Sequence, residues 1–159
     1  MVIRSYEERD REAVICLFRD FMAEMGDFAA YVERAISEEL GRIAAYYLTD
    51  PRQGFWVADD VVGMVGIERQ SDKVAELRRM VVARTHRRRG MARALLATAE
   101  DFCRQAGYAT IVLNTSELQR PAMLLYEASG YRRVRTARPE ETTHKLVGGL
   151  TRHYYEKKL

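Results

Sequence analysis

The sequence is poor in the residues that build metal sites and disulfide frameworks. It has two cysteines, Cys16 and Cys103, which form no CxxC pair, and three histidines that are scattered along the chain. This spacing argues against a zinc site, so we expect no bound metal. Each cysteine lies among apolar residues at helical spacing, which predicts two buried free thiols in a reducing compartment.

Long apolar runs are also missing. No stretch approaches the roughly 20 apolar residues that a membrane-spanning helix needs. Half of the first ten residues are charged, and the segment lacks the apolar centre of a secretory signal peptide. We therefore expect a cytoplasmic protein that does not act at a membrane.

Lysine is scarce, whereas arginine is abundant. The basic residues comprise 22 arginines and four lysines, and the formal net charge is only +3. Such a small charge does not by itself indicate a nucleic-acid-binding protein. Arginine is suited to planar, bidentate contact with phosphate and carboxylate groups, so the places where arginines cluster matter more than their number.

The remaining composition is that of an ordinary globular protein. The 159 residues are 47% hydrophobic and 31% charged, without repeats or a linker long enough to separate two domains. A chain of this size buries enough surface to be stable without disulfides or metals. We therefore expect a single domain over residues 1–159.

Apolar residues recur at three- and four-residue steps in two segments of the first third of the chain. The first segment predicts an amphipathic helix over about residues 6–25, opened by a capping box at Ser5 and Glu8. The second predicts a helix over about residues 32–48. Val2–Arg4 before them can form a short strand.

The pattern then changes to short apolar runs separated by turns. Three runs predict an antiparallel meander, and a helix, a strand, a second helix and two strands follow it. The expected ranges are about 54–58, 61–68 and 74–83 for the meander, then 91–106, 109–113, 121–130, 131–134 and 150–158. The order β-α-α-β-β-β-α-β-α-β-β indicates an α/β fold with a mixed sheet.

The segment from Glu76 to Ala92 places a strand, a basic loop and a helix start in succession. The helix start carries unpaired N–H groups and partial positive charge. Gly90 lets the backbone approach a ligand closely, and Arg87, Arg88 and Arg89 add cationic side chains. Electrostatics favours a phosphate site here, with a solvated basic helix start as the alternative.

Two motifs resemble the GNAT superfamily of acetyl-CoA-dependent N-acetyltransferases. Arg87-Arg88-Arg89-Gly90-Met91-Ala92 matches the family signature R/Q-x-x-G-x-G/A, with a strand before it and a helix after it. Residues 113–134 (LNTSELQRPAMLLYEASGYRRV) are similar to the later family helix that ends in L-Y-E-x-x-G-[FY]. The expected element order is also that of the superfamily, so the resemblance extends over nearly the whole chain.

The resemblance implies acetyl-CoA as the cosubstrate. In the family, the loop and helix start hold the CoA pyrophosphate, and the strand before them binds the pantetheine arm where a bulge splays it from the next parallel strand. These roles fall on Arg87, Arg88, Arg89, Gly90, Met91 and Ala92 for the pyrophosphate and on Met80, Val81 and Val82 for the arm. Asn114, at the end of the next strand, is expected to reach the cofactor or the acceptor.

The resemblance also indicates two catalytic residues. Tyr126 stands where the family places a tyrosine that faces the CoA sulfur, so it is the candidate general acid; the alternative is a buried tyrosine packed under the sheet. Glu76 stands where some members have a catalytic glutamate, and strand alternation puts Glu76, Arg78 and Met80 on one face. Glu76 is the candidate base or, alternatively, a structural partner of Arg78 or an exposed strand residue. A strand amide near Met80 or Val81 is the expected oxyanion donor.

Family architecture places the acceptor near the first helix pair and the last hairpin. Candidate wall residues are Met25, Phe28 and Tyr31. The loop over residues 137–149 is either a plain solvated loop or a source of acidic recognition for a cationic amine, through Glu140, Glu141 and His144.

We therefore predict an enzyme that moves an acetyl group from acetyl-CoA to a primary amine of a small molecule or peptide by direct attack. Its expected partners are acetyl-CoA, the amine and a second copy of the chain, since family members often dimerise. One alternative is a non-catalytic acyl-CoA-binding sensor. Another is nucleic-acid binding through Arg84–Arg93, which the absence of an aromatic platform between these arginines disfavours.

Overall fold

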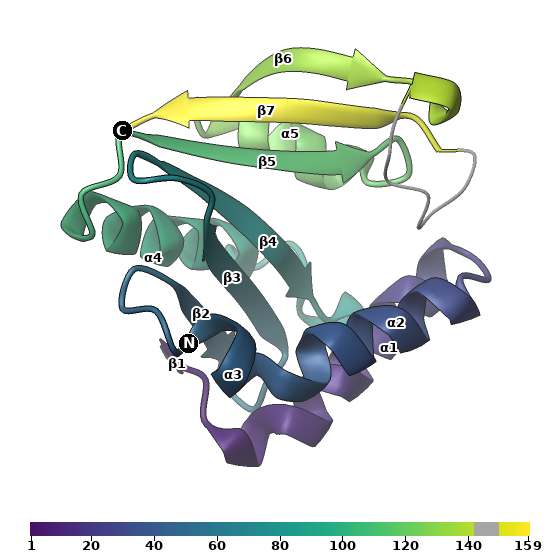
Figure 1. Ribbon diagram of the computed structural model, residues 1–159. Helices are drawn as coiled ribbons and strands as arrows, with labels where there is room; N and C mark the ends of the chain where they lie inside the picture. The colour runs from purple at the N-terminus through teal and green to yellow at the C-terminus, as the bar shows by residue number, and fades with distance from the viewer. Residues whose placement is uncertain (142–149) are drawn as a thin grey trace.

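The computed structural model describes residues 1–141 and 150–159, and these residues form a mixed seven-stranded sheet with the order β1-β2-β3-β4-β5-β7-β6 (Figure 1). Within it, β4 and β5 run parallel and the other neighbours run antiparallel. The strands are β1 (Ile3–Ser5), β2 (Gly54–Ala58), β3 (Gly63–Arg69), β4 (Val74–Val82), β5 (Thr110–Ser116), β6 (Arg132–Ala137) and β7 (Arg152–Lys158). The predicted mixed α/β fold and its meander β2-β3-β4 are confirmed.

Helices cover both faces of the sheet, so the core has two layers. One face carries α1 (Arg11–Met25), α2 (Ala29–Glu38) and α3 (Ile43–Tyr47), and the other carries α4 (Met91–Gln105) and α5 (Arg120–Ala128). Short 3-10 turns lie between these elements, over Glu8–Asp10, Leu40–Arg42, Arg84–His86 and Pro139–Glu141. None of the helices in the described part of the chain is long and apolar enough to cross a membrane.

The first helix begins later than the sequence predicts. A 3-10 turn precedes the helix, with Glu7 as its N-cap residue. The N–H of Glu7 donates to Asp10 Oδ2 at 2.9 Å. Asp10 is buried and also accepts two hydrogen bonds of 2.8 Å from Arg4 of β1. This contact ties the helix start to the sheet, so the predicted capping box at Ser5 and Glu8 is wrong.

The second predicted helix is broken into α2 and α3. Glu39 leaves helical geometry after α2, and its buried side chain turns toward Arg78 and Arg79 of β4. The turn needs glycine at position 41, because a Cβ on Gly41 would lie 2.8 Å from the carbonyl oxygen of Ile36. The break therefore brings a carboxylate from the helical layer onto the sheet.

The two cysteines differ in exposure. Cys103 is buried in α4, whereas Cys16 is exposed on α1. The prediction of two buried thiols is wrong for Cys16, because the buried stripe of α1 passes beside it. That stripe consists of Val14, Leu17, Phe18 and Met22.

The parallel strands β4 and β5 pair only at their starts. The register joins Val74–Glu76 to Thr110–Val112, and no pairing follows beyond Glu76. From that point β4 continues beside β3, while β5 runs with β7 away from it (Figure 1). One edge of β4 is thus left open along the second half of the strand.

A bulge in β4 changes which face its side chains occupy. Residues 79 and 80 together face a single residue of β3, and Arg79 takes a left-handed φ of 55°. As a result, Arg78 and Arg79 both contact Glu39 on one face, whereas Met80 packs against the core layer under α4. The prediction that Glu76, Arg78 and Met80 share a face is therefore wrong for Met80.

Candidate active site

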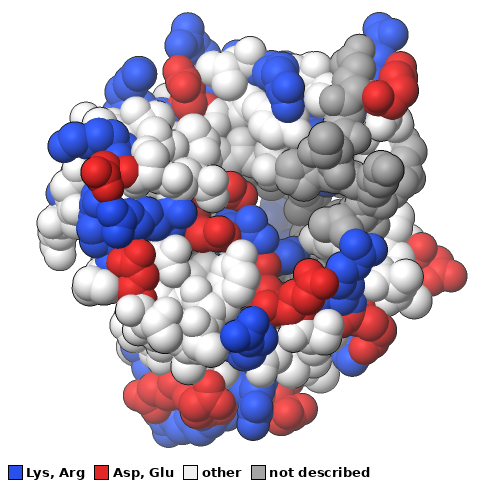
Figure 2. All heavy atoms as spheres, in the orientation of Figure 1, with Lys and Arg blue, Asp and Glu red and all other residues white. Residues whose placement is uncertain are grey.

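The divergence of β4 and β5 opens a cavity of about 350 Å³. Its apolar wall comes from α1 and the start of α2, through Phe18, Phe21, Met22, Met25, Phe28 and Tyr31. Its polar wall comes mainly from the strands and α5, through Glu76, Arg78, Arg79, Asn114, Tyr126 and Arg152. In Figure 2 the surface is hollowed between the helices and the upper strands, with acidic and basic side chains around the hollow.

Glu76 occupies the last position at which β4 and β5 are paired. It is paired with Glu68 of β3 and lines the cavity. Its carboxylate accepts hydrogen bonds from Gln70 at 2.9 Å and from Arg78 at 3.2 Å. Burial raises the pKa of Glu76; the charge of Arg78 lowers it, and the charge of Glu68 raises it further. The result is a carboxylate more basic than an ordinary one, as a general base requires.

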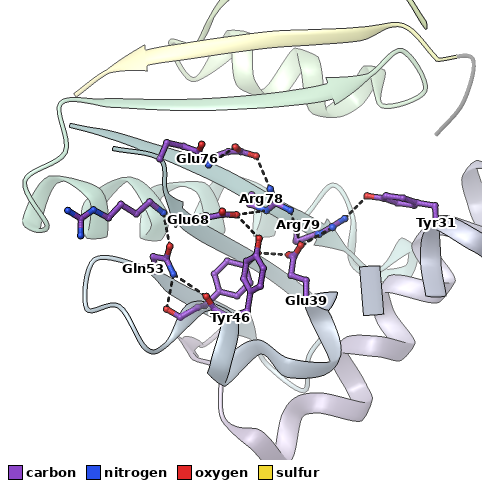
Figure 3. A network of polar contacts seen from close by, with 11 residues as sticks. Tyr31, Glu39, Tyr46, Gln53, Glu68, Glu76, Arg78 and Arg79 are labelled. Carbon is purple, nitrogen blue, oxygen red and sulfur yellow. Dashed lines mark hydrogen bonds and ion pairs between the residues drawn. The ribbon is translucent and has the colours of Figure 1, made fainter. Parts of the chain in front are cut away.

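Arg78 connects Glu76 to the rest of a polar network (Figure 3). Its guanidinium lies 2.8 Å from Glu39, 3.2 Å from Glu68 and 3.2 Å from Glu76. The same guanidinium thus contacts the candidate base and two further carboxylates. Both readings of Glu76, as a cavity carboxylate and as a partner of Arg78, are true of its geometry.

Arg79 is matched in the same way. It donates to the two oxygens of Glu39 at 3.0 and 2.9 Å and to the Tyr31 hydroxyl at 2.7 Å. Burial alone would raise the pKa of Glu39, but the hydrogen bonds from Arg79 and the two guanidinium charges lower it to about 2. Figure 3 shows this pair, which joins the residue after α2 to β4.

Tyr126 of α5 reaches the cavity from the opposite face of the sheet. It is 6% exposed, and its ring packs near those of Tyr131 and Tyr155, with centroids 5.7 and 6.2 Å away. Its hydroxyl makes no hydrogen bond to the described side chains and backbone of residues 1–140 and 150–159. Burial raises the pKa of Tyr126 well above its ordinary value, so the phenol keeps the proton that a general acid must donate.

The start of α4 is open to a ligand. Gly90 has a left-handed φ of 80°, and a Cβ there would meet no atom within 4 Å. The neighbouring side chains of Arg88 and Arg89 are exposed and bind none of the described residues. Met91 is buried and Ala92 packs against the core, so these two residues offer only their backbone. These features fit a pyrophosphate.

Arg87 differs from its neighbours. It donates to both oxygens of Glu24 in α1 at 2.7 and 3.0 Å and to the carbonyl oxygen of Val82 at 3.0 Å. Two of the three predicted phosphate arginines are therefore free in this structure, and the third is held by an ion pair.

The open edge of β4 presents backbone amides. The N–H of Ala83 donates to the carbonyl oxygen of Val62, the residue just before β3, so strand alternation turns the N–H of Val81 to β3 and those of Val82 and Met80 to the open side. This edge fits the amide-rich pantetheine arm, with Met80 and Val82 as donors. Of the two expected oxyanion donors, the alternation favours Met80.

Asn114 of β5 lines the cavity, but its carbonyl oxygen is occupied. Arg152 of β7 donates to Asn114 Oδ1 through Nε and Nη2 at 2.9 and 2.7 Å. Arg152 was not anticipated from the sequence, because only the folded sheet brings the start of the last strand beside Asn114. No motif marks it.

The acceptor residues are partly where the sequence predicts them. Met25, Phe28 and Tyr31 line the cavity. Glu140 is exposed and does not line it, and the side chain of Glu141 and all of His144 lie outside the described residues. Within the described ranges, no group of three or more His, Cys, Asp or Glu side chains is placed to hold a metal ion.

Known proteins share both the sequence pattern and the fold. N-acetyltransferase 8 of Rattus norvegicus is 35% identical over 135 residues, which are 76% of this chain and 60% of that protein. N-acetylaspartate synthetase of Danio rerio is 35% identical over 132 residues, 80% of this chain and 45% of that protein. The chain thus spans about half the length of these curated relatives.

Solved structures match nearly the whole chain. An acetyltransferase of the GNAT family from Staphylococcus aureus Mu50 has a TM-score of 0.79 at 19% identity and covers 99% of this chain and 98% of its own. An aminoglycoside 6′-N-acetyltransferase complexed with coenzyme A has a TM-score of 0.76 at 17% identity, with coverages of 99% and 97%. Residues 14–131 match the Acetyltransferase (GNAT) family, so the resemblance is confirmed and the chain belongs to this family.

Proposed function

We propose that the protein is an acetyl-CoA-dependent N-acetyltransferase that acts on a primary amine of a small molecule or peptide. The observation that carries the proposal is that Glu76 and Tyr126 line one cavity, opened where β4 and β5 diverge. A basic carboxylate and a protonated phenol therefore border the same space. The relatives and neighbours, which carry names of acetyltransferases, support the reaction class.

Acetyl-CoA supplies the acetyl group as an activated thioester when it is bound. The open edge of β4 binds the pantetheine arm through the amides of Met80 and Val82. The backbone at the start of α4, with Arg88 and Arg89, binds the pyrophosphate. Arg87 also binds the pyrophosphate when its guanidinium leaves Glu24 and contacts a phosphate group instead.

Three groups of this chain serve the transfer. Glu76 takes a proton from the acceptor ammonium, which frees the nitrogen lone pair to attack the thioester carbon. The N–H of Met80 donates to the carbonyl oxygen, which gains negative charge as the C–N bond forms. Tyr126 gives its hydroxyl proton to the sulfur as the C–S bond breaks. The nitrogen, which is again positively charged once the C–N bond has formed, loses its second proton to solvent, and the phenol regains a proton from solvent.

The acid role is tested by Tyr126→Phe in an assay of CoA release with acetyl-CoA, a panel of amines and a thiol reagent. Loss of a general acid lowers kcat by about 10²- to 10⁴-fold, with little change in acetyl-CoA binding. Tyr154→Phe on β7, outside the cavity, is the control and keeps the wild-type rate. An unchanged rate for Tyr126→Phe contradicts the acid role.

The base role is tested by the pH dependence of kcat. Glu76 must be deprotonated to act, so the wild-type rate rises with pH through its raised pKa. In Glu76→Gln the rate falls by about 10²-fold and this rising limb disappears. A Gln variant that keeps the limb assigns the base to another group.

The sensor alternative predicts a different outcome. Calorimetry would show tight binding of acetyl-CoA, while no amine in the panel would be acetylated. A homodimer and a cytoplasmic location remain predictions; sedimentation of the purified protein measures the first.

A further inference from the structure

Of the arginines that line the cavity, Arg152 is the one whose positive charge is least neutralised by carboxylates of the described residues. It stands at the start of β7, opposite Ser116 of β5, and lines the same cavity as Glu76 and Tyr126. Within the described ranges, its side chain makes two hydrogen bonds, both to Asn114 Oδ1, at 2.9 and 2.7 Å. A neutral amide oxygen satisfies two N–H groups but does not neutralise the charge.

The other arginines that line the cavity are neutralised by carboxylates. Arg78 and Arg79 together meet three carboxylates, those of Glu39, Glu68 and Glu76. Among the described side chains of residues 1–140 and 150–159, Arg152 forms no ion pair. Burial lowers the pKa of Arg152; Tyr31, Tyr154 and Glu76 act in the opposite direction, and the charge of Arg79 lowers it. A half-buried cation in this situation is stabilised by an anion that enters the cavity.

The two ends of the polar wall carry opposite excess charge. At the β4 end, three carboxylates face two guanidinium groups, and Glu76 belongs to this negative end. At the β7 end stands Arg152, close enough to Glu76 for the two charges to interact. A ligand with an ammonium group and a carboxylate group a few bonds apart matches both ends.

We propose that the acceptor is an amine that also carries a carboxylate, and that Arg152 binds this carboxylate while Glu76 faces the ammonium group. The inference rests on the proposed acetyl transfer and specifies its acceptor. It differs from the expected acidic recognition of a purely cationic amine, because Arg152 repels such a ligand. The apolar wall formed by Phe21, Met25 and Phe28 accommodates an apolar side chain on the same molecule.

The test compares free amino acids with their carboxamides. L-methionine, L-leucine and L-phenylalanine are assayed for acetyl-CoA-dependent CoA release beside the three matching amides and spermidine. A carboxamide has the more easily deprotonated amine, so a preference for the acid must come from the site. We expect the wild-type kcat/KM to be about 10-fold or more higher for the acids, as a charged hydrogen bond to the carboxylate provides.

Variants of Arg152 assign that preference to the side chain. Arg152→Gln lowers kcat/KM for the acids by about 10- to 100-fold and changes it for the amides by less than about threefold. Arg152→Lys keeps the charge and retains part of the preference. Arg135→Gln is the control, because Arg135 is exposed on β6 and stacks on Tyr154 outside the cavity. Thermal unfolding of each variant shows whether it is folded.

Two results overturn the inference and leave the acetyltransferase proposal standing. One is turnover of amides or spermidine as efficient as that of the acids, and the other is an equal loss on acids and amides in Arg152→Gln. Binding of acetyl-CoA without turnover of any amine is a different failure. It removes the proposed function itself and, with it, this inference.

Discussion

Two groups of arginines in this protein differ in what they contact. In β4, Arg78 and Arg79 are half-buried and matched by the carboxylates of the network around Glu39. In the loop before α4, Arg88 and Arg89 are exposed and bind none of the described residues. Matched arginines fix the shape of the cavity, whereas unmatched arginines are free to bind an anion.

The comparison explains why the number of arginines says little about their role. Arginines that are adjacent in the sequence can differ in this respect. Arg87 forms an ion pair with Glu24, whereas its neighbour Arg88 binds none of the described residues. Arg152 lies far from the loop but resembles Arg88 in having no carboxylate partner in the described ranges. The identity of the partner decides the role, and folding supplies the partner.

The largest expected effect on stability comes from removing the carboxylate of Glu39 from its ion pairs with Arg78 and Arg79. Glu39→Gln removes the carboxylate that Arg79 contacts in a buried place, and one of the three carboxylates that Arg78 contacts. The free energy of unfolding should fall by about 3–5 kcal/mol. Glu38→Gln, one residue earlier and exposed, should change it by less than about 0.5 kcal/mol. Urea denaturation measures both, and equal small effects would contradict the structural role of Glu39.

The same carboxylate predicts how stability depends on pH. The folded pKa of Glu39 is lowered from 4.5 to about 2, so its contribution is complete above the unfolded value and is lost as the pH falls between these two values. The shift corresponds to about 3 kcal/mol. Denaturation of wild type and Glu39→Gln at pH 7 and pH 3 should show a larger acid loss in wild type. Parallel losses would argue against this assignment.

Substituting the arginines without a carboxylate partner should weaken the binding of acetyl-CoA and leave the fold intact. Arg88→Ala and Arg89→Ala each remove a charged contact to a phosphate, so the KM for acetyl-CoA should rise by about 10-fold. The melting temperature should stay unchanged, because neither side chain binds a described residue. The control is Arg132→Ala, which removes an exposed arginine of β6. A normal KM in both loop variants would mean that the basic helix start is only solvated.

The smallest effect tests the intermediate case, Arg87. Glu24→Gln releases this arginine from its ion pair, which is partly exposed and therefore worth less than about 1 kcal/mol. Acetyl-CoA should bind up to about threefold more tightly, as measured by calorimetry. Weaker binding would show that Glu24 positions Arg87 for the ligand and does not compete with it.

The sequence predicts the features of this site that depend on neighbouring residues. The strand, basic loop and helix start around Gly90 are local, and so is the helix that carries Tyr126. The missed features depend on contacts between distant segments. Glu39 and Arg79 are 40 residues apart, and Asn114 and Arg152 are 38 apart. Periodicity describes one element at a time, so it could not show that Glu39 leaves its helix or that the bulge moves Met80 to the other face.

A crystal structure with CoA bound tests the central claim most directly. The account predicts the CoA sulfur within hydrogen-bonding distance of the Tyr126 hydroxyl, with the pantetheine arm along the open edge of β4 and Glu76 facing the free end of the cavity. A CoA molecule whose sulfur lies elsewhere, with Tyr126 still enclosed by protein, would contradict it.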